Sequence, residues 1–309
     1  MLTLFPKFKK RLILFEVLYI ALMVVLYILK PGANSIAMLL MLLVGALLIA
    51  AAQYINAVNA HNRQLNRLYN QLDVEGFLKE YEPHLKQNPS NPNLYTMIRM
   101  HISNAYAAQG RFEDAVKLLS SIQVKEGKKP EQALISRYTI TSNLCYCAEQ
   151  MGDIPAAKKY LDELHRLKKQ LEDIQETKPM KQRMAFSSEL NDQCMALLTT
   201  GKADIEKLKT QVQQNNTQQL HRVTTSLWIA RAYLAEQNRR EAETLLEKIV
   251  KLAPDLYPAR KPRVCWLLCP PSLPKNNPFS AARNAAVFLY IAAFSDAIRR
   301  KSSPYGIPR

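Results

Sequence analysis

The stretch "SNAYAAQGRFEDAVKLLSSI", from Ser103 to Ile122, predicts two short helices that meet at Gly110. Glycine is a common helix terminator because it adopts the left-handed backbone conformation without a steric penalty. The pattern returns in "NLCYCAEQMGDIPAAKKYLDEL" around Gly152. It returns again in "SLWIARAYLAEQNRREAETLLEKIVKLAPD", where Gln237 stands in place of the glycine. A helical hairpin found three times at matched offsets indicates a repeat protein, whose units bury their apolar faces by stacking.

The repeated positions also predict how the hairpins pack. A tyrosine or alanine stands four residues before each turn residue, and an alanine stands five residues after it. The small alanine lets the two helices approach closely, and a large apolar residue further along faces the next hairpin. The residues expected to pack the repeats are Tyr106, Gly110, Ala115, Gly152, Ala157, Tyr233, Ala242 and Pro254.

Two more hairpins are expected on weaker grounds. "NDQCMALLTTGKADIEKLKTQVQQN" predicts one around Gly201, although it lacks the alanine at the matched offset. Residues 62–92 predict a further helix pair that closes the stack on its N-terminal side.

These offsets resemble those of the tetratricopeptide repeat family over about residues 95–255. The spacings from Gly110 to Gly152, Gly201 and Gln237 are 42, 49 and 36 residues in turn, whereas the family unit has about 34. Longer helices or linkers are therefore expected, with an irregular superhelix. The sequence predicts an all-α fold, in which an N-terminal transmembrane helical hairpin is followed by an irregular, tetratricopeptide-like α-solenoid.

The resemblance implies a concave groove, lined by the first helix of each hairpin, that holds a peptide. The family's clamp for a C-terminal carboxylate needs several Lys, Arg and Asn residues in adjacent units. Only Asn104 and Arg231 qualify here, so that activity is not expected. The alternative for the groove positions is a solvated helix face. The candidate groove-lining residues are Met97, Met100, Asn104, Ala108, Ser142, Tyr146, Gln150 and Arg231.

Two apolar stretches, 12–29 and 36–52, precede the repeats. Each is long enough, with its flanks, to cross about 30 Å of hydrocarbon as a helix. The short "KPGANS" between them makes a hairpin, and the second stretch argues against a cleaved signal peptide. Glu16, inside the first stretch, is either a functional intramembrane carboxylate or a side chain that reaches the interface beside Arg11.

Basic residues flank the outer ends of the two apolar stretches, whereas Lys30 is the one basic residue of the turn between them. The positive-inside rule therefore predicts a two-span membrane protein with both termini and the repeats in the cytoplasm. The flanking basic residues are Lys7, Lys9, Lys10, Arg11, Arg63 and Arg67.

The net charge of +16 divides into +4 in residues 1–60, +4 in 61–255 and +8 in 256–309. Basic flanks around a nearly balanced centre suit contact with anionic lipid better than nucleic-acid binding, which is not expected; simple solvation of the flanks is the alternative.

The sequence divides into three regions: a hairpin at 1–60, repeats at 61–260 and a proline-rich basic tail at 261–309. The tail contains an apolar run, 285–294, that is either a surface helix, a cap on the last repeat or the product of a reading-frame error.

No sequence motif indicates an enzyme. The nucleotide-binding, hydrolase and metalloprotease signatures are missing, and the five histidines are scattered without ligand spacing. The five cysteines are expected to be free thiols, so no catalytic residue, metal or cofactor is predicted. We expect a membrane-anchored cytoplasmic scaffold that binds a protein or peptide. The alternatives are a structural spacer in a membrane complex and an enzyme whose site the sequence does not display.

Overall fold

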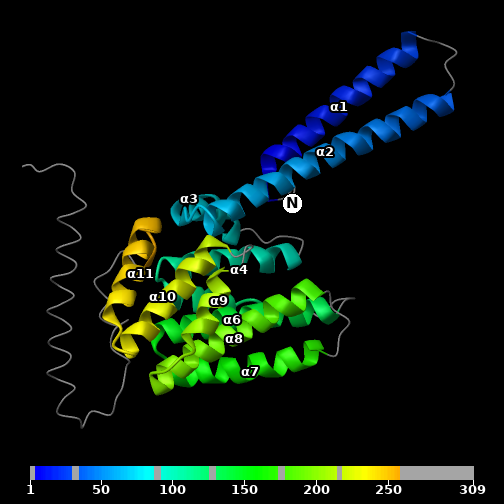
Figure 1. The fold of residues 1–309 in the computed structure, drawn as a ribbon. Coiled ribbons are helices and arrows are strands. Elements are labelled where there is room, and N and C mark those ends of the chain that lie inside the picture. The colour runs from blue at the N-terminus through cyan, green and yellow to red at the C-terminus, as the bar shows by residue number, and fades with distance from the viewer. Residues whose placement is uncertain are drawn as a thin grey trace, which may run out of the picture.

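The computed structural model describes residues 4–29, 35–86, 92–124, 130–172, 178–213 and 218–257. In these segments eleven α-helices pack in pairs (Figure 1), which confirms the predicted all-α class. The predicted tail, 261–309, lies outside the described residues, together with Cys265 and Cys269.

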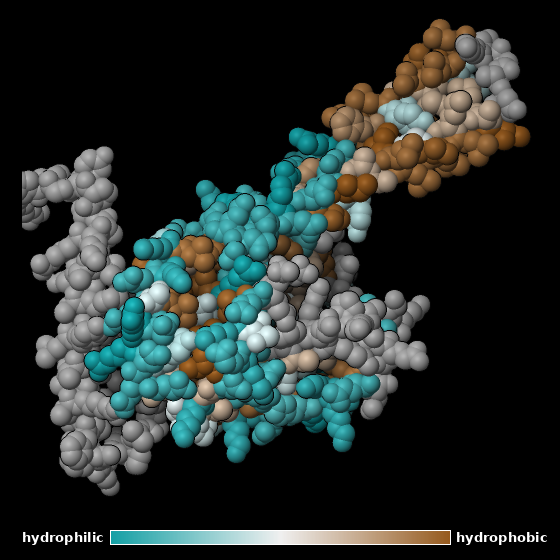
Figure 2. All heavy atoms as spheres, viewed as in Figure 1, coloured by the Kyte–Doolittle hydropathy of each residue, from teal (hydrophilic) through white to brown (hydrophobic). Residues whose placement is uncertain are grey.

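Helices α1 (Pro6–Leu29) and α2 (Ser35–Tyr69) form a hairpin that projects from the other helices (Figure 1). Both are long and apolar enough to cross a membrane, and only 6% of the most apolar stretch of each is buried. Figure 2 shows hydrophobic surface over most of the hairpin and mainly hydrophilic surface over the other described residues in this view.

The two helices of the hairpin approach closely at Gly45. A Cβ atom at Gly45 would lie 2.1 Å from the Tyr19 hydroxyl oxygen, so the missing side chain makes room for the tyrosine. The Tyr19 hydroxyl in turn donates a hydrogen bond of 2.6 Å to the Met41 carbonyl oxygen. Helices α1 and α2 thus pack together here through a small residue, Gly45, that faces a large one, Tyr19.

Helix α2 continues past residue 60, where the sequence placed the boundary between hairpin and repeats. Its last turns pair with α3 (Val74–Tyr81), which the 3-10 helix η1 (Glu82–Lys86) follows. Phe5, directly before α1, and Phe8, in its first turn, are buried in the same apolar core as residues of α3 and α4. The base of the hairpin and the first repeats therefore share one core.

Four further pairs complete the stack, and the second helix of each packs on the first helix of the next. The pairs are α4 (Pro92–Ala108) with α5 (Phe112–Ser120), α6 (Pro130–Met151) with α7 (Ile154–Glu172), α8 (Lys178–Thr200) with α9 (Ile205–Gln213), and α10 (Gln219–Ala235) with α11 (Arg239–Leu252). Helices α6, α7 and α8 have 22, 19 and 23 residues, whereas α5 and α9 have nine each. These unequal lengths make the stack irregular.

Each pair of this stack turns at one residue with a positive φ. The residues are Leu72 at 60°, Gly110 at 80°, Gly152 at 74°, Gly201 at 71° and Gln237 at 63°. In three pairs the amide after this residue bonds the carbonyl five residues earlier, which caps the first helix. These bonds run from Arg111 to Tyr106, from Asp153 to Ala148 and from Asn238 to Tyr233.

The alanines five residues after these turns are completely buried. Ala115, Ala157 and Ala242 each have 0% of their surface exposed. In the α8–α9 pair the matched position is Glu206, whose side chain is 80% exposed, and α9 packs instead through Ile205 and Leu208. The other repeat residues are less uniform, since Tyr106 is buried, Tyr233 is half-buried and Pro254 is exposed.

The last pair folds back on the beginning of the stack. Helix α10 packs on α2, and Leu227 of α10 and Ile249 of α11 are buried in the same core as Ile102 of α4. The Phe112 and Tyr257 rings meet edge to face with their centroids 5.0 Å apart. The two ends of the stack are therefore in contact.

Candidate functional site

The predicted groove residues of α4 serve internal packing. Ala108 is buried, and Met97 and Met100 are half-buried against two apolar cores. The Asn104 side-chain amide donates a hydrogen bond of 2.9 Å to the Tyr69 hydroxyl oxygen. Through Asn104, this part of the predicted groove contacts the end of α2.

The predicted groove residues of α6 and α10 behave differently, because the fold brings two of them together. The Arg231 guanidinium donates a hydrogen bond of 2.9 Å to the Gln150 side-chain oxygen, across 81 residues of sequence. Ser142 hydrogen-bonds Ser187 with 2.7 Å between their oxygens, and the half-buried Tyr146 ring lies against Phe112.

Around the Gln150–Arg231 contact lies a set of polar groups that we call the inner polar cluster. Its members are Cys145, Glu149, Gln150, Trp228 and Arg231. The Arg231 guanidinium carbon lies 4.1 Å from the centre of the Trp228 ring. Glu149 is only 2% exposed, and one of its carboxyl oxygens lies 3.4 Å from the Cys145 sulfur, which donates a weak hydrogen bond to it.

Burial controls the charges of this cluster. Desolvation raises the pKa of Glu149 to about 8, although the hydrogen bond from Cys145 and the positive charge of Arg231 act in the opposite direction. Desolvation also lowers the pKa of Arg231 to about 10. At neutral pH the cluster therefore combines a mostly protonated carboxyl group with a charged guanidinium group.

Several polar atoms on α6 and α10 are buried without a hydrogen-bond partner within the described part of the protein. They are Asn143 Nδ2, Glu149 Oε2, Gln150 Nε2, Trp228 Nε1 and Arg231 Nε. Buried polar atoms in folded proteins are nearly always hydrogen-bonded. Four of these atoms are nitrogen donors and the fifth is a carboxyl oxygen, so this part of α6 and α10 keeps unused hydrogen-bonding capacity.

A second polar cluster, which the sequence did not reveal, joins α2, α3 and α4. His61 hydrogen-bonds the Tyr81 hydroxyl through Nδ1, and Tyr69 and His101 are joined by a bond of 2.8 Å. Burial lowers the pKa of His101 to about 4 and also lowers that of His61. Both rings are thus neutral at pH 7 and pack within the core, where no local signal links residues from different helices.

Burial disfavours the thiolate form of the described cysteines. Cys145, Cys147 and Cys194 are buried and free, and burial raises the pKa of Cys147 to about 12. Across the described segments, no three His, Cys, Asp or Glu side chains lie together as metal ligands would.

Comparison with known proteins identifies one repeat. A tetratricopeptide repeat model matches residues 225–255, which include most of α10 and all of α11. No curated protein matches the chain, and no solved structure does. The fold and this match together define a class: an all-α protein of stacked helix pairs, with a tetratricopeptide repeat as its last pair. A repeat of this kind indicates a protein partner in general terms.

Proposed function

We propose that this protein is a membrane-anchored scaffold that binds a polypeptide on the inner polar cluster. The single observation that carries the proposal is the concentration of unpaired polar atoms on α6 and α10. A buried donor or acceptor that has no partner destabilises the protein by about 1–3 kcal/mol. Asn143, Gln150 and Arg231 are half-buried, so a polypeptide bound beside them would pair their nitrogen atoms through its own backbone carbonyl oxygens. The proposal includes no catalytic activity.

The apolar surface of the hairpin supports the anchor. Long apolar side chains face outward along both helices, for example Leu29 and Leu47, which are 70% and 69% exposed. Soluble monomers rarely expose continuous apolar surface on this scale. Hydrocarbon chains would cover it, and each helix is long enough to reach across about 30 Å.

The basic residues support a cytoplasmic position for the repeats. Lys7 and Arg11 of α1 and Arg63 of α2 lie near one another at the end of the hairpin that carries the repeats. Positive charge marks the cytoplasmic side of membrane proteins. The start of α1, the end of α2 and the stack would therefore lie in the cytoplasm.

Site-specific photo-crosslinking tests partner binding. A photoreactive amino acid at Asn143, half-buried and seven residues before Gln150 on the same face of α6, should give discrete adducts in native membranes. The same group at Lys158, an exposed residue of α7, should not. Arg231→Gln should remove the adducts from the Asn143 position while the helical circular dichroism remains unchanged.

A different outcome would favour the alternative that the protein is a structural spacer. If the folded Asn143 variant gives no adduct, or if Asn143 and Lys158 give the same adducts, the inner polar cluster does not bind a partner. The anchor is tested separately, because an integral protein stays in the membrane fraction during alkaline extraction.

A further inference from the structure

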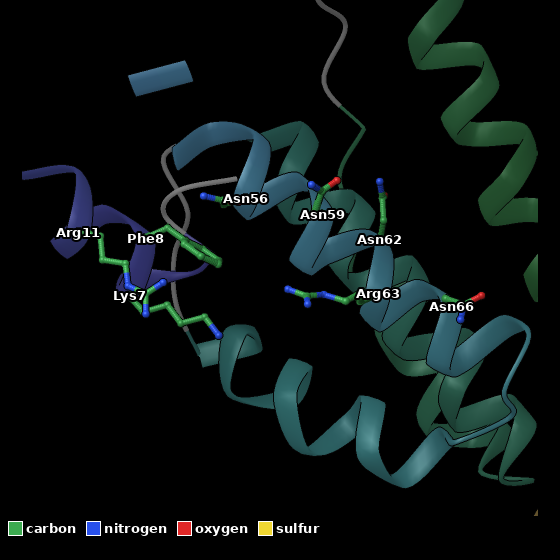
Figure 3. Close-up of a pocket in the computed structure, with 8 residues that line it drawn as sticks. All are labelled: Lys7, Phe8, Arg11, Asn56, Asn59, Asn62, Arg63 and Asn66. Carbon is green, nitrogen blue, oxygen red and sulfur yellow. The ribbon is translucent and has the colours of Figure 1, made fainter. Parts of the chain in front are cut away.

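A hollow of ≈ 700 Å³ lies at the base of the hairpin, between the start of α1 and the middle of α2. Three of its lining residues are cationic, four are asparagines and none is acidic. In Figure 3 the Arg63 side chain extends from α2 toward the start of α1, where Lys7 and Phe8 lie. The lining residues are Lys7, Phe8, Arg11, Asn56, Asn59, Asn62, Arg63 and Asn66.

Among the residues that the structure describes, the three cations of this hollow have no counter-ion. Lys7, Arg11 and Arg63 are exposed, and none forms an ion pair with any residue that the structure describes. By contrast Arg67, one turn further along α2, pairs with Asp73 at 2.6 Å. Unpaired cations held near one another repel, so an anion between them would be stabilising.

The asparagines are a second, independent observation. Four of them occur within residues 56–66 of a continuous helix, although asparagine is a poor helix former. All four line the hollow. Their amide groups add hydrogen-bond donors beside the cations, and guanidinium, ammonium and amide donors together suit the oxygens of a phosphate group.

The position of the hollow indicates where its ligand comes from. Tyr54 and Ile55, directly before Asn56, are 53% and 56% exposed, and the apolar part of α1 begins directly after Arg11. The hollow therefore lies where both helices change from apolar to polar surface (Figure 2). In a membrane this is the level of the lipid headgroups, where exposed tyrosine is also common.

We propose that this hollow binds a phosphate group, and that the phosphate belongs to the headgroup of an anionic phospholipid beside the hairpin. The phosphate chemistry depends only on the residues of the hollow. The lipid source rests on the proposed insertion of the hairpin in a membrane.

The test uses the full chain in uncharged detergent, titrated with phosphatidylglycerol or phosphatidylcholine and followed by native mass spectrometry. Phosphatidylglycerol should bind more tightly. The double variant Lys7→Gln/Arg63→Gln should lower its affinity on the order of 30-fold, since each cation near a membrane surface contributes about fivefold. The matched control is Lys9→Gln/Lys10→Gln, which removes the same charge from exposed residues outside the hollow and should retain the affinity.

Equal weakening by both double variants would overturn the proposal, because general attraction would then explain the binding. No weakening by Lys7→Gln/Arg63→Gln would also overturn it. A parallel titration with glycerol phosphate identifies the source. Saturable binding of this soluble ligand, lost in Lys7→Gln/Arg63→Gln and accompanied by no preference between the two lipids, would assign the phosphate site to a soluble ligand.

The outcome is separable from that of the proposed anchor. A protein released by alkaline extraction that still binds glycerol phosphate through Lys7 and Arg63 would contradict the anchor alone. An integral protein whose lipid affinity ignores these two residues would contradict the phosphate site alone.

Discussion

Gln237 adopts the left-handed conformation that glycine adopts in the hairpins at Gly110, Gly152 and Gly201, with a φ of 63°. A side chain in this conformation brings Cβ close to the following carbonyl, at a cost of about 1–2 kcal/mol. The turn forms nevertheless, because the Asn238 amide bonds the Tyr233 carbonyl oxygen at 2.8 Å and Asn238 caps the next helix. The local strain at this single residue is thus offset by capping on both sides of the turn.

Gln237→Gly should therefore stabilise the protein. Relief of the strain exceeds the extra entropy that glycine gives the unfolded chain, so we expect the free energy of unfolding to rise by about 0.5–1 kcal/mol. Chemical denaturation of the full chain in uncharged detergent, followed by circular dichroism, measures the change. Ala235→Gly, two residues earlier but helical, is the control and should destabilise. A loss of stability in Gln237→Gly would contradict the strain.

Glu149 should make stability depend on pH. Its pKa is about 8 in the folded protein, against 4.5 for an ordinary glutamate. Between these values the folded state keeps a proton that the unfolded state has lost, so the free energy of unfolding falls as pH rises from 4.5 to 8. Glu149→Gln should gain about 1–3 kcal/mol over the natural protein at pH 8 and nothing at pH 4.5. Thermal melts of both proteins at the two pH values test this, and an equal difference at both would exclude the buried carboxyl as its cause.

At the scale of the helix pair, the buried alanine determines how closely two helices pack. Ala115, Ala157 and Ala242 occupy one offset in three pairs and are fully buried in each. The α8–α9 pair lacks this alanine, and its second helix starts later. Helix α9 begins four residues after the turn residue, whereas α5 and α7 begin two residues after theirs. Ile205 and Leu208 then fill the contact.

Ala242→Glu should unfold the α10–α11 pair. Overpacking costs about 1–3 kcal/mol, and a buried unpaired charge adds to it. Thr244→Glu, two residues further along on the exposed face of α11, should change the free energy of unfolding by less than about 0.5 kcal/mol. Glu206→Ala should be equally mild, since the structure exposes the matched residue of α9. An Ala242→Glu protein that melts like the natural one would show that the two helices are held apart.

At the scale of the whole molecule, the two ends of the stack are in contact, and short stretches of sequence do not predict this contact. It passes through the turn at Gly110, where a Cβ atom would lie 2.0 Å from the Tyr257 ring. Gly201 has a similar φ, but nothing lies within 4 Å of its Cβ position. A substitution at Gly201 therefore introduces backbone strain alone, whereas one at Gly110 also disturbs the contact between the two ends of the stack.

Gly201→Ala should cost about 1 kcal/mol, from strain alone, whereas Gly110→Ala should cost about 1–3 kcal/mol more because it also displaces Tyr257. The free energies of unfolding of the full-length variants test this. In a double-mutant cycle, Tyr257→Ala should reduce the cost of Gly110→Ala and leave that of Gly201→Ala unchanged. Equal costs for the two glycine variants would show that the ends of the stack are not in contact.

The sequence by itself determined the features that depend on short stretches of chain. Apolar runs of about 18 residues predicted α1 and the first half of α2, and turn residues with a buried alanine five positions later predicted the hairpins. These signals are local, because the conformation of a turn or the length of a helix depends on neighbouring residues. The sequence did not predict that α2 continues past residue 60. The change from apolar to polar residues suggested a boundary there, but no helix-breaking residue stands at that point and the helix runs on to Tyr69.

Only the tertiary structure decided which groove residues remain available. Asn104 and Gln150 both looked like groove positions, yet the first binds Tyr69 inside the stack and the second meets Arg231 beside unpaired polar atoms. The contact of Phe112 with Tyr257 and the hollow at Arg63 likewise join distant segments. Their positions depend on the curvature that accumulates over helices of unequal length, and this sum of small rotations is a property of the packed stack that no single stretch of sequence contains.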